Sequence, residues 1–222
     1  MASPLSTLII KELNQELRNK DSILSMAVFG LSIILIFSFA FDMSTPNVNS
    51  ILPGLIWLTF MFTFIIGLSR NFTREKDGMG ISLLLTSPID RGYIFLSKTV
   101  VFTIYLFISQ LCLFPLFYLF LGFTAITNWQ LWALSLLVNW GMSALGVVIS
   151  GLGFRSKMGD VLTALLFFPL ASPVLISAVK STSAISRGIK FELYSFWCML
   201  ILSFAVGFTV LGMFLFDYIM EE

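Results

Sequence analysis

The sequence of 222 residues is 58% hydrophobic and only 11% charged, with a net charge of +1. A soluble domain carries roughly 25% charged residues, so this composition excludes an ordinary water-facing surface and favours several membrane spans joined by short loops. The charge balance gives no reason to expect a nucleic-acid partner, and the lack of histidine removes the commonest metal ligand and the usual physiological acid–base group.

The first twenty residues predict an amphipathic helix over 4–20. Proline at position 4, directly after Ser3, is typical of the first turn of a helix. Apolar side chains then recur at every fourth position, at Leu5, Ile9, Leu13 and Leu17. A helix with this pattern lies in the membrane interface. The alternative is a plain cytoplasmic tail.

Six apolar segments follow, each close to the roughly 20 residues that a helix needs to cross a bilayer. The first is too long for the apolar part of a signal peptide, so we expect it to be retained. The chain is therefore predicted to be an all-α membrane protein, a single transmembrane domain over 1–222. The predicted spans are 22–41, 51–69, 99–121, 130–152, 161–179 and 195–216.

Lysine and arginine predict the orientation of these spans, because cytoplasmic loops are enriched in them. Ten of the 13 fall in the N-terminal segment and in the second and fourth loops, and both termini are therefore expected in the cytoplasm. The remaining three, Lys180, Arg187 and Lys190, fall in the fifth loop, against this trend.

The predicted spans contain no charged residue in their interior, which argues against a proton-coupled carrier. Gln110 and Asn139 are their deepest strongly polar residues, and hydrogen bonding between helices is the favoured role. Trp140 also falls deep, where packing is favoured over lining a substrate path. The other tryptophans fall near predicted outer ends, where indole rings favour the headgroup layer: Trp57, Trp129, Trp132 and Trp197.

No phosphate-binding loop for ATP occurs in the sequence. If the chain takes part in transport, we therefore expect the energy to come from another polypeptide. The cytoplasmic stretch 70–98 is the candidate contact surface, because charged residues are followed there by glycines and by an apolar run that ends at a proline. The candidate coupling residues are Arg74, Glu75, Lys76, Asp77, Gly78, Leu84 and Pro88, and a second cytoplasmic contact is expected at Arg155, Lys157 and Asp160. The alternative is an ordinary solvated loop.

The same stretch resembles the E-x-x-G…L-L-x-x-P…R…L-x-K signature of ABC-2 type permeases. The matching residues are Glu75 to Gly78, Leu83 to Pro88, Arg91, and Leu96 to Lys98. The resemblance implies the ABC-2 type permease fold, in which this stretch forms a cytoplasmic coupling helix that docks on an ATPase. Lys76 departs from the pattern, because this position lies in a stretch that is often acidic in relatives.

Within that superfamily the chain is most similar to the CcmB family, haem exporter protein B. Pro53-Gly54-Leu55-Ile56-Trp57 is similar to the family's P-G-I-I-W segment. Phe168-Pro169-Leu170 with Pro173 is similar to its L-P-L…P pattern.

This resemblance implies a homodimer in the bacterial inner membrane, paired with two CcmA-type ATPases that bind ATP and Mg²⁺. It also implies CcmC and CcmD as membrane partners and the periplasmic haem chaperone CcmE. We assign no catalytic, cofactor or metal site to this chain, and expect haem in the assembly. The expected function is haem export and delivery to the chaperone, or ATP-driven release of the loaded chaperone. The alternatives are an ABC-2 permease that exports a lipid, polysaccharide or drug, and a membrane scaffold without transport.

Overall fold

The computed structural model describes residues 4–18, 20–41, 48–77, 90–153 and 159–221, and these are helical throughout apart from short turns. The all-α fold predicted from the sequence is thereby confirmed. The helices are α1 (Pro4–Arg18), α2 (Lys20–Ala40), α3 (Val48–Asp77), α5 (Arg91–Leu121), α6 (Trp129–Gly153), α7 (Gly159–Ser186) and α8 (Phe191–Glu221), with a short 3₁₀ helix, η1 (Thr124–Thr127), before α6.

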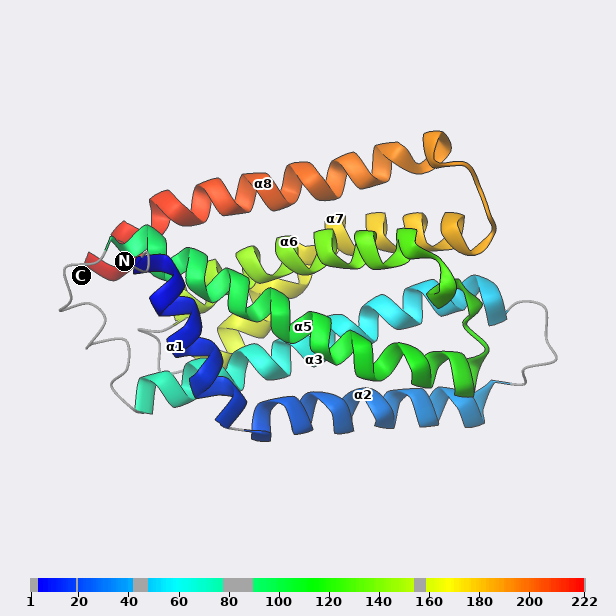
Figure 1. Ribbon diagram of the computed structural model, residues 1–222, viewed down its shortest axis with the longest axis horizontal. Coiled ribbons are helices and arrows are strands. Elements are labelled where there is room, and N and C mark those ends of the chain that lie inside the picture. The colour runs from blue at the N-terminus through cyan, green and yellow to red at the C-terminus, as the bar shows by residue number, and fades with distance from the viewer. Residues whose placement is uncertain (1–3, 19, 42–47, 78–89, 154–158, 222) are drawn as a thin grey trace.

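Six helices are long and apolar enough to cross a membrane, and they run side by side as one bundle (Figure 1). The shorter α1 lies across one end of this bundle. The C-terminal ends of α3 and α8 and the start of α5 lie at that same end, here called the α1 end. Helix η1 and the turn between α7 and α8 lie at the other, here called the opposite end.

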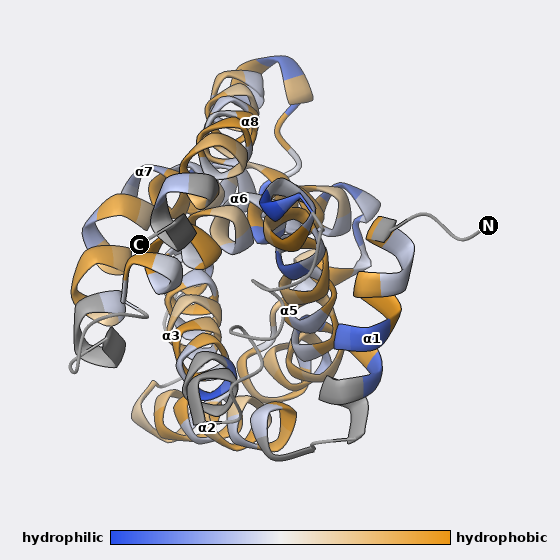
Figure 2. Ribbon diagram, turned by 90° about the vertical axis from the view of Figure 1, so that its left-hand side faces the viewer, coloured by the Kyte–Doolittle hydropathy of each residue, from blue (hydrophilic) through white to orange (hydrophobic). Residues whose placement is uncertain are grey.

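Helix α6 lies at the centre of the bundle and packs against α5, α7 and α8. Small residues permit these close approaches, as is usual between membrane helices. A Cβ atom added at Gly146 would lie 2.7 Å from the ring of Phe64 on α3, so a larger residue there would force that ring to shift. Helices α2 and α8 lie at the rim and expose apolar side chains, and α1 shows both apolar and hydrophilic residues (Figure 2).

Local hydrogen bonds fix both ends of α5. The Asp90 side chain accepts from the amide of Gly92 at 2.9 Å, which caps the first turn. Gly122 ends the helix in the left-handed region, with φ of 67°, and the amide of Phe123 donates to the carbonyl of Phe117. This reversal delivers the chain to η1 at the opposite end.

The helices extend beyond the predicted spans. Helix α3 continues through Asp77 and α5 begins at Arg91, so both flanks of the stretch 70–98 are helical. Helix α7 continues through Ser186, which places Lys180 inside it.

The tryptophans divide into two groups. Trp129, at the opposite end, is 76% exposed, as expected of a ring in the headgroup layer. The prediction for Trp57 was wrong: its ring is completely buried, and its Nε1 donates to Thr182 Oγ1 on α7 at 2.8 Å. Trp140 is half-buried and donates to Thr209 Oγ1 on α8 at 3.0 Å, in line with a packing role.

Candidate functional site

The candidate coupling residues fall at the α1 end as far as the structure describes them. The backbone of residues 74–77 forms the C-terminal turn of α3, and Asp160 lies in the first turn of α7. The remaining candidates lie outside the described residues, namely Gly78, Leu84, Pro88, Arg155 and Lys157. The described helices α3 and α5 therefore bracket the candidate coupling segment.

A buried ion pair joins α1 to α5 at this end. Lys98 Nζ lies 3.2 Å from Glu12 Oε1, and the two side chains are only 1% and 10% exposed. Removing either charge alone would break this buried ion pair, which is strongly unfavourable. The pair therefore holds α1 against the N-terminal part of α5.

Sequence reasoning missed this pair. The apolar stripe of α1 is centred on Leu8 rather than on Leu5 and Ile9, and Glu12 lies one turn further along the same buried face. The spacing of four between Leu8 and Glu12 was a usable signal, since an acidic residue on a buried face requires a basic partner. Lys98 was expected at the surface because the predicted span began after it, whereas α5 begins at Arg91.

The Glu12–Lys98 ion pair joins α1 to the N-terminal part of α5. Residue 98 lies seven residues into α5, which corresponds to about 10 Å along the helix axis. Separating α1 from α5 would break this buried ion pair, which opposes independent movement of the two helices at this point.

A neutral amide pair joins α5 to α6 deeper in the bundle. Gln110 Nε2 donates to Asn139 Oδ1 at 2.9 Å, and Asn139 Nδ2 donates to Gln110 Oε1 at 2.8 Å. Both side chains are completely or almost completely buried. The predicted role in hydrogen bonding between helices is confirmed.

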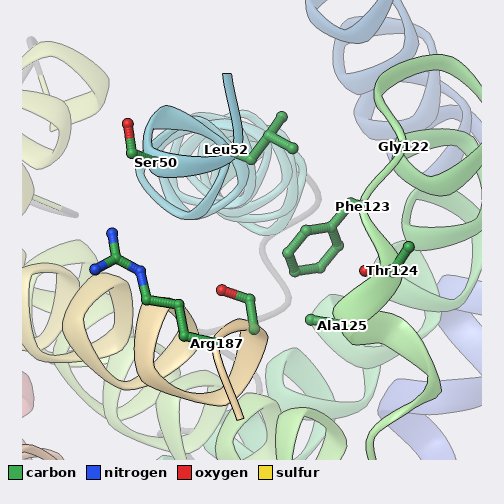
Figure 3. Close-up of a pocket in the computed structure, with 8 residues that line it drawn as sticks. Ser50, Leu52, Gly122, Phe123, Thr124, Ala125 and Arg187 are labelled. Atoms are coloured by element: carbon green, nitrogen blue, oxygen red, sulfur yellow. The ribbon is translucent and has the colours of Figure 1, made fainter. Parts of the chain in front are cut away.

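A cavity of about 420 Å³ opens at the opposite end, between α3, α7 and the segment that leads into η1 (Figure 3). Ser50 and Leu52 line it from α3, Phe123 and Thr124 from the other side, and Arg187 from the end of α7. Its walls are partly polar, so it can admit water and solutes. Among the described residues, no group of three or more Cys, Asp or Glu could hold a metal ion.

Comparison with known proteins relates the whole chain to one family. The family model described as CcmB protein matches residues 3–221. A "Heme exporter protein B" of Pseudomonas aeruginosa is 25% identical over 209 residues, which cover 94% of each chain. Another protein of that name, from Bradyrhizobium diazoefficiens, is 23% identical over 185 residues, or 83% of each chain. With six candidate spans and a match over nearly its full length, the chain belongs to the CcmB family of membrane proteins.

Proposed function

We propose that this chain is the membrane-spanning subunit of an ABC-type haem exporter that serves cytochrome c maturation. The observation that carries the proposal is the family match over residues 3–221, together with two full-length relatives named for haem export. The bundle of six apolar helices supplies the membrane part of such a machine.

A separate CcmA-type ATPase supplies the energy in this proposal and binds ATP with Mg²⁺. It docks at the α1 end, which faces the cytoplasm of a bacterium whose inner membrane holds the chain. Ten of the 13 basic residues belong to the segments predicted on that side, which supports this orientation. The buried pair of Glu12 and Lys98 supports transmission, because it couples α1 to α5 beside the docking segment.

The finer assembly is a homodimer that associates with CcmC, CcmD and the periplasmic chaperone CcmE. In this scheme the motion of the dimer drives release of the haem-loaded chaperone, and a neighbouring subunit handles most of the haem. The lack of histidine supports the handling of haem by another subunit, since a haem site with two histidine ligands cannot form within this chain.

The deciding experiment is purification of the tagged chain from membranes, followed by mass spectrometry and a haem absorption spectrum. We expect a CcmA-type ATPase and CcmC to co-purify, and haem absorbance to vanish when CcmC is deleted. An unrelated ATPase in the preparation would favour export of a lipid, polysaccharide or drug. A preparation without any ATPase would favour a scaffold.

Docking is tested by replacing Glu75 and Asp77 together with alanine. We expect the variant to enter the membrane normally but to retain less ATPase and to yield less cytochrome c. The matched control is Glu192→Ala, which removes an exposed carboxylate at the opposite end of the bundle. Equal ATPase recovery from the double variant and the control would refute docking at this segment.

A further inference from the structure

A lateral groove runs between α3 and α7 on the outer surface of the bundle. Its volume is about 320 Å³ and its walls are almost entirely apolar. It opens outward, since Ile176 on its wall is 54% exposed. The residues that the argument uses are Gly54 and Trp57 on α3, and Phe168, Ser172, Ile176 and Lys180 on α7.

The two segments that resemble segments of the CcmB family both contribute to this groove. Pro53-Gly54-Leu55-Ile56-Trp57 supplies one wall, and the turn after Phe168-Pro169-Leu170 supplies the other. A Cβ atom at Gly54 would meet no atom within 4 Å, so a larger side chain at this position would project into open space of the groove. Trp57 backs the groove and is held in place by its hydrogen bond to Thr182.

The α7 wall remains regular despite its prolines. Pro173 lacks the amide that would bond to the carbonyl of Pro169 one turn earlier. The hydroxyl of Ser172 donates to that carbonyl instead, at 2.7 Å. Ser172 therefore faces its own backbone, and the groove retains its apolar character.

The shape of the groove fits a single hydrocarbon chain. Phe168, Ser172, Ile176 and Lys180 are spaced by four residues and form one ridge. The ridge covers twelve residues, which is about 18 Å of helix. The groove, with a volume of about 320 Å³, lies along this ridge, so an extended hydrocarbon chain can lie in it.

The charge of the groove is at one end only. Lys180 is exposed and lies at the end of the ridge nearer the opposite end of the bundle. Basic residues are expected mainly on the cytoplasmic side of the membrane. The three that fall in segments predicted on the other side are Lys180, Arg187 and Lys190. A cation at one end of an apolar groove is complementary to an anionic amphiphile.

We propose that this groove binds one acyl chain of an anionic phospholipid, whose headgroup phosphate lies at Lys180. This inference goes beyond the proposed function and does not depend on it. The bound lipid fills the groove between α3 and α7, and it makes the site sensitive to lipid composition.

The test uses the complex as isolated from membranes, placed in phosphatidylcholine nanodiscs that contain a phosphatidylglycerol with a photoreactive acyl chain. After irradiation, peptide mass spectrometry locates the adducts. We expect adducts on residues 168–180 in excess of those on α8, and suppression of this excess by Gly54→Leu, which fills the channel. Gly207→Leu on α8 is the matched control, because a Cβ atom there also meets nothing within 4 Å.

The headgroup contact is tested separately by Lys180→Gln. We expect the preference for phosphatidylglycerol over an equivalent phosphatidylcholine probe to fall about fivefold, the effect of one lysine near an anionic lipid. Lys190→Gln, which removes an exposed cation outside the groove, should leave the preference unchanged. This variant also decides the question if Gly54→Leu fails to fold.

Three results would overturn the proposal. Equal labelling of α7 and α8 would show that the groove holds ordinary bilayer lipid. Saturable displacement of the probe by haem would make haem the occupant. Protection of residues 168–180 by a second copy of the chain or by a partner protein would make the groove a protein interface.

Discussion

Helices α6 and α8 cross the bundle side by side but differ sharply in burial. The mean hydropathy of α8 is 2.4 and that of α6 only 1.7, yet only 22% of an 18-residue window of α8 is buried, against 78% of such a window of α6. In a soluble protein the more apolar helix would be expected in the core. Here the less apolar helix occupies it.

The difference follows from the solvent. Lipid tails are as apolar as leucine, so hydrophobicity gives no reason to bury one helix rather than another, and close packing decides. Helix α6 offers small residues to its neighbours, as at Gly141, where a Cβ atom would lie 3.5 Å from Ala205. Helix α8 exposes Phe196 and Phe214. Hydropathy therefore identifies a membrane span, while residue size indicates its place in the bundle.

The largest expected effect concerns α1, which is less apolar than α6 or α8 and still buries the carboxylate of Glu12. Glu12→Gln should lower the free energy of unfolding by about 3–5 kcal/mol, because it breaks a buried ion pair by removing one of its two charges. The measurement is thermal unfolding in detergent, with Glu192→Gln as the exposed control.

The paired replacement separates charge from packing. Glu12→Leu combined with Lys98→Met should recover most of the lost stability, since a buried ion pair can be replaced by apolar residues of similar size. If the pair also transmits movement, this double variant should fold yet respond less to the ATPase. Full stability of Glu12→Gln alone would show that the carboxylate is not held in a dry contact.

The next effect tests the comparison of α6 with α8 directly. Gly146→Leu should cost about 1–3 kcal/mol or prevent assembly, because its Cβ atom would lie 2.7 Å from the ring of Phe64. Gly207→Leu, the same change on α8, should be close to neutral, since nothing lies within 4 Å. Equal unfolding temperatures for the two variants would break the proposed link between residue size and burial.

The smallest effect concerns the amide pair. Gln110→Leu and Asn139→Leu should each destabilise the bundle, and a double-mutant cycle should give a coupling energy of about 0.6–1.7 kcal/mol, as for other hydrogen bonds between membrane helices. A coupling energy near zero would mean that water or a neighbouring group replaces the lost partner.

The sequence predicts depth in the membrane well but not the direction in which a side chain points. The six helices, the start of α1 at Pro4 and the pairing role of Gln110 and Asn139 all follow from composition and spacing. Trp57 was placed wrongly because an indole near a helix end faces either the headgroups or the bundle, and only packing against α7 selects one. Lys98 was missed because its partner lies 86 residues earlier, on a helix that was expected only to rest on the membrane surface.

The neutrality of the amide pair has a consequence for any working cycle of the bundle. A charge that crosses the membrane field exchanges roughly 2.3 kcal/mol per 100 mV, so moving charged groups would tie the cycle to the membrane potential. Gln110 and Asn139 carry no net charge, and no change of pH in the physiological range alters that. Sliding of α5 against α6 at this contact therefore moves no net charge of these two side chains through the membrane field. The strength of the contact does not depend on whether the membrane is energised.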